Sequence, residues 1–512
     1  MIAVTTPATS AAQPRSAASV VLSADEAVAL IQDGQTLAIG GSGGGLLEPG
    51  ALLEALGRAY QENGHPRDLT LLHATGIGDR QGSGLGHLAH RGLARRVVAG
   101  NWGNAPGMGE LALANELEAY NFPQGVMSQM FREVAAGRPG VITHVGIGTF
   151  CDPRLEGGKL NDAAVEDLVS VIEIDGREWL HYRPIPPDVS FIRGTAADED
   201  GNISFEHEAA KLEMLAMAQA TRNNGGIVIA QVKRQVARGA IDAKHVLVPG
   251  ICVDVVVVVP EQRQLDSVEY DPALSGETRV LPSAIPPMPF DQRKVVARRA
   301  LREVATGDVV NLGVGIADGV ASVAAEQGWI QRFTCTIEQG IIGGIPARGI
   351  DFGVATNPQA MVDQPSQFDF YDGGGIDIAF LGFAQVDRHG NVNVSKFSGR
   401  VVGTGGFVNI SQNAGTVVFC GTFTAGGLAA RPVDGRLDIE QEGRFRKFVR
   451  DVEQVTYSGI EGARRGQRVL YVTERAVFTL RPTGLVLIEV APGIDLQRDV
   501  LDQLDWDVQV DP

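Results

Sequence analysis

The segment FTCTIEQGIIGG places one carboxylate, Glu338, where a reactive group could stand. The alternating residues 333–337 predict a short buried strand. Gly340, Gly343 and Gly344 follow, and they exclude bulky side chains and allow another segment of backbone to approach closely. Open α/β folds bind ligands outside the carboxyl ends of their strands. Glu338 is therefore a candidate catalytic residue, and the alternative is a surface glutamate at a strand end.

A carboxylate can act as an acid or base, as a metal ligand or as a nucleophile. Acid/base work of the glycosidase kind needs a paired acid, and no second carboxylate is tied to Glu338 by spacing. Metal binding needs more ligands, and the nine histidines show neither HxxxH nor HExxH spacing. Nucleophilic attack on an acyl or phosphoryl group needs N–H donors for the developing oxyanion, each worth about 3 kcal/mol. Glycine turns supply such donors, so a nucleophile is the role that best uses these surroundings.

The turn GVGIADG (residues 313–319) supports a competing interpretation. It is close to a dinucleotide fingerprint, and Glu338 lies about twenty residues on, where such folds bind a ribose hydroxyl. The chain would then be an NAD(P)-dependent oxidoreductase. The spacing is GxGxxxG instead of GxGxxG, and no separate residue for hydride transfer is identifiable.

Other polar residues offer weaker chemistry. His73 and His389 sit near turns, where a lone histidine is more often structural. Ser42 lies in GGSGG, which resembles a nucleophile elbow but has no assignable His and Asp partners. Lys396 and Arg400 follow the GNVN turn and could meet phosphates or form an exposed basic pair.

The elements that would position these residues occur twice along the chain. A helix over 23–34, a strand over 36–39, a glycine turn, a second helix and a strand over 69–78 predict a parallel, doubly wound sheet. In the second half, DVVNLGVGIADG matches TLAIGGSGGG, and FTCTIEQG matches LTLLHATG. This repetition predicts two related open α/β domains, with mainly parallel sheets flanked by helices. In this register Ala74 stands where the second half has Glu338, so shared packing does not easily explain the carboxylate.

Length and composition favour two domains. A chain of 512 residues exceeds one ordinary hydrophobic core. Residues 1–21 are predicted to be a disordered tail, 22–270 the first domain, 271–290 a proline-rich linker and 291–512 the domain that carries Glu338.

Charge and hydropathy narrow the class of protein. The net charge of −17 argues against a nucleic-acid partner, and the longest apolar run, 250–260, has strand length and not membrane-span length. The N-terminus lacks the pattern of a signal peptide, so a cytoplasmic location and no membrane association are expected. The four cysteines are widely spaced without a CxxC pair, which predicts buried free thiols and no metal site.

Several longer blocks resemble the class I CoA-transferases. They include TIEQGIIGGIPA, QFDFYDGGGIDIAFLGFAQVDRHGNVNVSKF, GTGGFVNI and FCGTFTAGGL in the second half, and AYNFPQGV and VGIGTFCDPRLEGGKLN in the first. The resemblance runs from about residue 22 to the C-terminus and is greatest for single-chain enzymes of the acetate/propionate or 3-ketoacid type. It implies two fused domains of the CoA-transferase fold and a homo-oligomer.

The resemblance also implies a mechanism. Glu338 would attack an acyl-CoA thioester, and the released CoA would form a glutamyl-CoA thioester that a second carboxylate then reopens. CoA is thus substrate and covalent intermediate, with no tightly bound cofactor, and the partners are acyl-CoA and short-chain carboxylates. An acyl-CoA hydrolase and a catalytically silent CoA-binding regulator remain alternatives.

The resemblance assigns the remaining site residues by motif. Gly313, Val314, Gly315, Gly403, Gly405 and Gly406 would line the CoA groove, Asn391 and the amide of Gly426 or Gly427 would form an oxyanion hole, and Gly43, Gly44 and Gly45 would close over the acyl group. Gln339 stands where the family usually has a small residue, so it is expected to narrow or polarise the acyl site. The chain also stops soon after LDWDVQV, earlier than many relatives do, which bears on its terminal packing.

Overall fold

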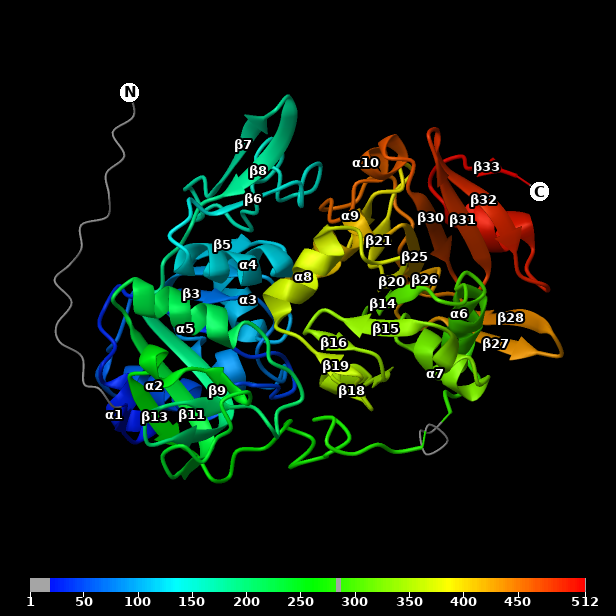
Figure 1. The fold of residues 1–512 in the computed structure, drawn as a ribbon. Helices are drawn as coiled ribbons and strands as arrows, with labels where there is room; N and C mark the ends of the chain where they lie inside the picture. The colour runs from blue at the N-terminus through cyan, green and yellow to red at the C-terminus, as the bar shows by residue number, and fades with distance from the viewer. Residues whose placement is uncertain (1–18, 282–286, 512) are drawn as a thin grey trace.

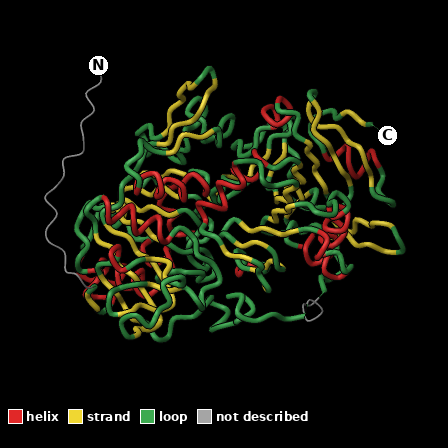
Figure 2. The backbone as a smooth tube through the Cα atoms, viewed as in Figure 1, coloured by secondary structure: helices red, strands yellow, loops and turns green. Residues whose placement is uncertain are grey.

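The computed structural model describes residues 19–281 and 287–511, which form two bodies lying side by side (Figure 1). Each body is built on a ten-stranded sheet. Helices and strands occur in both bodies (Figure 2). The predicted α/β class is confirmed.

The first sheet follows the path β1-β13-β11-β9-β2-β3-β4-β5, and every pair of neighbours along this path is parallel. Its strands are β1 (Val20–Val21), β13 (Val255–Val258), β11 (Ile227–Val236), β9 (Val189–Asp198), β2 (Thr36–Ile39), β3 (Leu69–His73), β4 (Ala94–Ala99) and β5 (Glu118–Asn121), with β10 (Ile203–Ser204) and β12 (Val246–Val248) attached at the side. The helices of this body are α1 (Ala24–Val28), α2 (Gly50–Asn63), α3 (Pro106–Leu113), α4 (Gln124–Ala135) and α5 (Met214–Asn223). The central strand β9 is buried along its whole length, as expected for a sheet covered on both faces. A small sheet of β6 (Val141–Thr143), β8 (Arg177–Tyr182) and β7 (Val169–Ile174) projects from the body (Figure 1).

The second sheet has a parallel centre and antiparallel flanks. Its order is β19 (Ala360–Met361), β16 (Ile341–Ile342), β15 (Thr334–Ile337), β14 (Val309–Leu312), β20 (Ile378–Gly382), β25 (Thr416–Cys420), β30 (Arg468–Val472), β31 (Ala476–Arg481), β32 (Gly484–Val490) and β33 (Gln509–Val510). Strands β15 to β30 are parallel along this path, whereas β16 and β31 run antiparallel to their neighbours. The helices are α6 (Gln292–Leu301), α7 (Gly319–Glu326), α8 (Gln364–Asp372), α9 (Phe407–Asn413) and α10 (Gly459–Arg464).

Five two-stranded ribbons decorate the second body. They are β17 (Ile345–Pro346) with β18 (Ala355–Thr356), β21 (Gln385–Val386) with β22 (Val392–Asn393), β23 (Lys396–Phe397) with β24 (Arg400–Val401), β26 (Thr424–Ala425) with β29 (Phe445–Arg446), and β27 (Ala429–Val433) with β28 (Arg436–Gln441).

The two bodies share apolar packing. The core of the first body also contains Ile337 and Ile341, which flank the tip of the β15–β16 hairpin of the second body. Helix α8 packs on α4 of the first body and lies between the two bodies (Figure 1). The hairpin is therefore held from both sides, which fixes its tip between the bodies.

Several local predictions need correction. The helix expected over 23–34 ends at Val28, although Ser23 caps it in a full capping box with Glu26. The strand expected over 69–78 ends at His73. Val20 and Val21 pair with β13, so ordered structure begins before residue 22, and residues 1–18 of the expected tail lie outside the described residues.

The expected linker and the cysteines can be compared with the described residues. Residues 271–281 and 287–290 contain no helix or strand, and residues 282–286 lie outside the described part. All four cysteines are buried free thiols, as predicted. Within the described ranges, no helix is both long and apolar enough to cross a membrane.

Candidate active site

Glu338 lies at the tip of a tight hairpin. Strands β15 and β16 pair Ile337 with Ile341, which leaves Glu338, Gln339 and Gly340 as a three-residue loop. Gly340 has a φ of +98°, and a Cβ at this position would lie 2.1 Å from the carbonyl oxygen of Val362. Only glycine fits there, as is typical of the left-handed position in three-residue hairpin loops. The hairpin therefore fixes the carboxylate at the carboxyl edge of the parallel sheet.

The Glu338 carboxyl group is buried and only partly satisfied. The residue is 8% exposed, and its Oε2 has no hydrogen-bond partner among the described residues. Burial raises the pKa of Glu338 to about 7, and the nearby Asn311 amide offsets part of this rise. A buried polar oxygen without a hydrogen-bond partner raises the free energy of the folded protein. This oxygen is therefore available to accept a hydrogen bond from a ligand or to react with it.

A cavity of about 240 Å³ opens in front of Glu338, and both bodies line it. The first body contributes Ser42, Gly43, Thr75, Gly76, Arg80, Asn101, Asn104 and Gln124. The second contributes Gly313, Val314, Glu338, Gln339, Gly349, Ile350, Phe352, Leu381, Gly382, Val394, Val402, Gly403, Thr404, Gly405, Gly406, Phe407 and Ile410. Among these lining residues Glu338 is the only carboxylate and Arg80 the only cation. The cavity is thus a chamber with a mixed polar and apolar lining, one carboxylate and one cation.

A backbone junction closes one side of the cavity. The N–H groups of Trp102 and Gly103 donate to Val402 O at 2.8 and 2.9 Å, and Gly405 N–H donates to Gly100 O at 2.7 Å. Gly406 is close to the carboxylate, since a Cβ there would lie 3.5 Å from Cγ of Glu338. The glycine segment 403–406 therefore brings the backbone against Glu338.

The amide side chains of the first body are held in defined orientations. Asn101 Oδ1 accepts from Gly103 N–H at 2.9 Å, and Asn104 Oδ1 accepts from Arg80 Nε at 3.3 Å. Gln124 Nε2 donates to Gln364 Oε1 at 3.1 Å, and Gln364 Nε2 donates to Glu213 Oε2 at 2.9 Å. Amides fixed in this way can present donors and acceptors to a ligand without reorganising.

Eight of the candidate residues named from the sequence lie together in the wall of this cavity. Glu338, Gln339, Gly43, Gly313, Val314, Gly403, Gly405 and Gly406 come together in its wall. Gly315 comes directly after the lining residue Val314 but does not line the cavity itself. Gly44 and Gly45 do not line it either, and they are packed against Ile350 and Asp266. A Cβ on Gly44 would lie 2.5 Å from Ile350 O, and one on Gly45 would lie 2.3 Å from Asp266 Oδ1.

The expected oxyanion hole does not assemble. Asn391 does not line the cavity, because its Nδ2 donates to Asp387 at 2.9 Å and its Oδ1 accepts from Gly459 N–H at 2.9 Å. Gly426 and Gly427 also lie off the cavity wall; the carbonyl of Gly426 accepts from Arg444, and that of Gly427 accepts from Gln441. Asn391, Gly426 and Gly427 therefore form hydrogen bonds within or beside their own turns. The predicted oxyanion hole made of these residues is not part of this cavity.

Of the remaining candidate residues from the sequence, only Ser42 lines the cavity. His73 is buried, its Nδ1 lies 2.6 Å from Thr75 O, and burial lowers its pKa to about 4. His389, Lys396 and Arg400 do not line the cavity. Ser42 does, and its Oγ accepts from Gln339 Nε2 at 3.4 Å; no histidine is among the residues that line the cavity.

Sequence reasoning missed Thr75, Asn101, Asn104 and Gln124 as site residues. Asn101 and Gln124 lie inside GNWG and FPQGV, two segments that carry the family resemblance. Nothing in their local pattern indicates that they face a carboxylate more than two hundred positions away, since loops bring them there.

The sequence is similar to those of known CoA-transferases. A family model described as coenzyme A transferase matches residues 21–259. Acetate CoA-transferase YdiF of Escherichia coli (strain K12) is 48% identical over 493 residues, which cover 96% of this chain and 93% of that protein. Caffeate CoA-transferase of Acetobacterium woodii is also 48% identical, over 95% of this chain and 94% of its own length.

Solved structures agree with these sequence relatives. The apoenzyme of acyl-CoA transferase YdiF from Escherichia coli O157:H7 superposes with a TM-score of 0.94 at 47% identity, covering 98% of this chain and 95% of that chain. A second structure of the same enzyme, a thioester complex with CoA, superposes with a TM-score of 0.93 over the same shares of both chains. The likeness extends over both bodies and not only over the segment that the family model matches.

Proposed function

Because this chain belongs to the coenzyme A transferase family, we propose that Glu338 carries CoA from a short-chain acyl-CoA to a small carboxylate. One observation supports this role more than any other. Glu338 is the only carboxylate among the residues lining the cavity between the bodies, and one of its oxygens has no partner among the described residues. A thioester complex with CoA of a 47% identical enzyme is consistent with a covalent intermediate here.

The first half-reaction begins with attack of Glu338 on the thioester carbonyl carbon. The carbon–sulfur bond breaks, CoA leaves as a thiolate, and an acyl-glutamyl anhydride forms. The thiolate then attacks the γ-carbonyl of Glu338, and the first acid leaves as a carboxylate. The product is a glutamyl-CoA thioester, and the acceptor carboxylate runs the same steps in reverse. A partly closed cavity protects both intermediates from water.

The raised pKa fits this task. With a pKa of about 7, roughly half of the Glu338 side chains are ionised at neutral pH in the free enzyme. Burial also replaces the water shell of the carboxylate by fixed protein dipoles, so little solvent has to be removed before attack. The ionised fraction increases with pH, which predicts faster acylation on the alkaline side.

The glycine segments and amides take the other roles. Gly313, Val314, Gly403, Gly405 and Gly406 form the groove for the pantetheine end of CoA. The amides of Asn101, Asn104, Gln124 and Gln339 replace Asn391, Gly426 and Gly427 as donors to the developing oxyanion and to the acid carboxylates, since they line the cavity.

The cavity favours a small acid. Its volume of about 240 Å³ must also hold the end of CoA, and Gln339, Ser42 and Thr75 give it a polar wall. A pocket distinguishes one methylene by about 1–3 kcal/mol, and acetate and propionate are the candidates that this volume fits best. The expected cytoplasmic location and homo-oligomeric state stay predictions.

The test is a covalent adduct. Incubation with acetyl-CoA, without an acceptor, should increase the mass of the protein by that of CoA less one water, because one oxygen of Glu338 leaves with the released acetate, and borohydride should reduce the thioester at Glu338. The variant Glu338→Ala should give neither the adduct nor exchange of CoA. If acetyl-CoA loses CoA to water at the transfer rate without an acceptor acid, the hydrolase alternative replaces transfer.

A further inference from the structure

A row of three polar side chains leads away from the cavity and ends at Glu213. Gln124, which lines the cavity, donates through its Nε2 to Gln364 Oε1 at 3.1 Å. Gln364 in turn donates through its own Nε2 to Glu213 Oε2 at 2.9 Å. Gln124 and Glu213 belong to the first body, whereas Gln364 begins α8 of the second body. Two hydrogen bonds across the boundary between the bodies therefore connect this acid to the cavity.

The backbone holds both ends of this row. Gln364 N–H donates to Leu212 O at 3.0 Å, so Gln364 contacts the segment 212–213 through its backbone as well as its side chain. Leu212 has a φ of +49°, a left-handed conformation that a leucine keeps only where its surroundings impose it. At the other end, Gln124 N–H donates to Gly405 O at 2.9 Å. The three side chains thus meet between fixed backbone segments.

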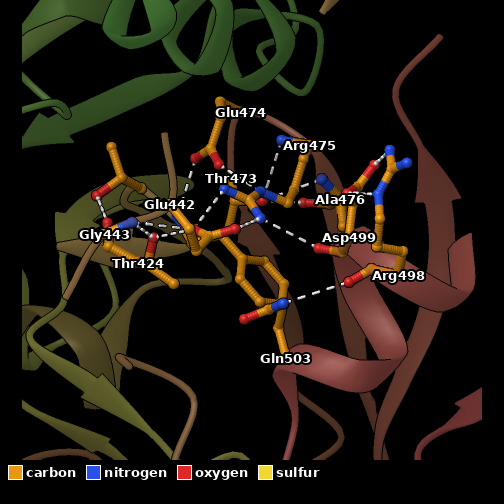
Figure 3. Close-up of polar contacts among 12 residues, drawn as sticks. Thr424, Glu442, Gly443, Thr473, Glu474, Arg475, Ala476, Arg498, Asp499 and Gln503 are labelled. Atoms are coloured by element: carbon orange, nitrogen blue, oxygen red, sulfur yellow. Dashed lines mark hydrogen bonds and ion pairs between the residues drawn. The ribbon is translucent and has the colours of Figure 1, made fainter. Parts of the chain in front are cut away.

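Two other buried acids of this protein are matched to a cation, and Glu213 is not. Figure 3 shows Glu474 beside the guanidinium of Arg475, whose Nε donates to it at 2.7 Å. Glu208 accepts from Nη2 of Arg193 at 3.2 Å. Glu213 forms no ion pair within the described part of the chain, and no charged neighbour shifts its pKa. Its place in the fold is therefore not that of one half of a buried ion pair.

An acid at position 213 lowers the stability of the fold. Glu213 is 1% exposed, and its Oε1 has no hydrogen-bond partner among the described residues. Burial raises the pKa of Glu213 to about 8, so most of these side chains are neutral at pH 7. An apolar side chain of the same size would avoid the cost of burying a polar group. What Glu213 supplies instead is the acceptor for Gln364.

This acceptor gives the row of hydrogen bonds a direction. Because Gln364 turns its Nε2 toward Glu213, it presents its Oε1 to Gln124. Gln124 must then offer an N–H to Gln364, which leaves its Oε1 and its second N–H for the cavity. If the Gln124 amide were reversed, its oxygen would face the oxygen of Gln364, and two acceptors would meet without a proton between them. The acid thus selects one orientation of the Gln124 amide over the other.

The Gln124 amide lies beside the segment that contacts Glu338. A Cβ on Gly405 would lie 3.5 Å from Gln124 Oε1, and one on Gly406 would lie 3.5 Å from Cγ of Glu338. Gly405 and Gly406 are consecutive residues of the cavity wall, so the amide and the carboxylate lie close to the same short segment. Reversal of the amide would exchange a donor for an acceptor close to the reacting group.

We propose that Glu213 is a positioning residue for CoA transfer, because it accepts from Gln364 and thereby holds the Gln124 amide in one orientation at the cavity wall. Glu213 does not line the cavity, so it acts through Gln364 and Gln124 and not on the substrate. The proposal rests on the proposed function, since it needs a reaction at Glu338 that this amide serves.

The test measures CoA transfer from acetyl-CoA to labelled acetate in variants of Glu213. Glu213→Met removes the acceptor at similar volume, so kcat should fall about tenfold while the KM for acetyl-CoA changes less than twofold. Glu213→Gln keeps an oxygen that can accept from Gln364 and should restore kcat to within about twofold of wild type. Met217→Leu, at a buried position one turn further along α5, is the control for packing and should leave kcat unchanged. Glu213→Ala removes the same acceptor without bulk and replaces Glu213→Met if that variant does not fold.

A second substitution at Gln124 separates positioning from a purely structural role. Once Gln124→Ala has removed the amide, adding Glu213→Met should lower kcat no further, because the amide that Glu213 orients is gone. Equal kcat in Glu213→Met and wild type, or the same tenfold loss with and without Gln124, would overturn the proposal. Wild-type protein that forms no CoA adduct would instead contradict the role of Glu338, so the two failures are distinguishable.

Discussion

Strands β3 and β15 occupy equivalent places in the two sheets, yet they end differently. Each lies next to the strand that precedes a glycine turn, β2 or β14. After β3 comes Ala74, which is fully buried, and a Cβ on Gly100 would lie 1.9 Å from its carbonyl oxygen. After β15 comes Glu338, at the wall of a cavity. The first edge is filled by its own protein chain, whereas the second edge is left open to a ligand.

The continuation of each strand explains this difference. Strand β3 has the parallel strand β4 on its outer side, whereas β15 turns back into the antiparallel β16. The hairpin holds Glu338 at the edge, and the first body then covers it with amides, hydroxyls and one cation, Arg80. One half supplies the nucleophile, and the other half supplies the surroundings that make it reactive.

Removing the carboxylate should have the largest effect. Glu338→Gln keeps the shape of the hairpin tip but cannot form the anhydride, so CoA transfer should fall by about 10³-fold or more. Transfer between acetyl-CoA and labelled acetate measures this loss, and the thermal unfolding midpoint confirms that the fold is kept. If this variant retained more than a tenth of the wild-type activity, the nucleophile would have to be a residue other than Glu338.

Breaking the hairpin should come next. Gly340→Ala adds a Cβ 2.1 Å from Val362 O at a φ of +98°, so it should cost about 2 kcal/mol or more of stability and displace Glu338. Gly225→Ala is the matched control, because its φ is +80° and no atom lies within 4 Å of the added Cβ. Chemical denaturation and transfer assays should separate the two variants. Equal losses in both would mean that the backbone angle alone matters.

The cover supplied by the first body can be tested without touching the nucleophile. A Cβ on Gly43 would lie 2.0 Å from Asn104 Nδ2, so Gly43→Ala should push this amide away and lower kcat/KM about tenfold. Gly50→Ala in α2, where nothing lies within 4 Å, should change neither activity nor stability by much. If the Gly43→Ala variant transfers CoA at the wild-type rate, this part of the first body encloses the site without contributing to the reaction.

The effect of pH on kcat/KM and on stability should be smaller than the effects of these substitutions, and the raised pKa of Glu338 determines its direction. The pKa of Glu338 is raised to about 7, so kcat/KM should rise with pH and level off above this value. Between the unfolded pKa near 4.5 and about 7 the folded protein binds the extra proton, so burial of Glu338 lowers stability progressively as pH rises. Glu338→Gln removes this cost, and its unfolding midpoint should exceed that of wild type more at pH 8 than at pH 5. A constant difference would contradict the raised pKa.

Much of this arrangement was accessible from the sequence, and the rest was not for identifiable reasons. The alternating residues before Glu338 and the glycines after it predicted a carboxylate at a strand end, and the repeat of the glycine turn predicted two related domains. The return of β15 into β16 was not predicted, because β16 has only two residues between glycines. Asn391 and Gly426 carried turn signals, and they close their own turns instead of facing Glu338.

The walls of the cavity depend on contacts between distant segments. Gln124 reaches the site because its side chain bonds Gln364 and its backbone N–H bonds Gly405 O at 2.9 Å. Neither contact leaves a local pattern around Gln124, which opens α4 as an ordinary first-turn residue. Such residues are found from the fold and not from periodicity.

In this mechanism one oxygen of the acceptor acid passes to the Glu338 carboxylate, and an isotope measurement tests this transfer directly. With acetyl-CoA and excess acetate labelled with the heavy oxygen isotope, each turnover should leave a heavy oxygen on Glu338. The peptide that contains Glu338 should become heavier by the isotope difference, while all other acidic peptides keep their mass. Turnover with no label in this peptide would contradict the account, since CoA would then move without a glutamyl anhydride.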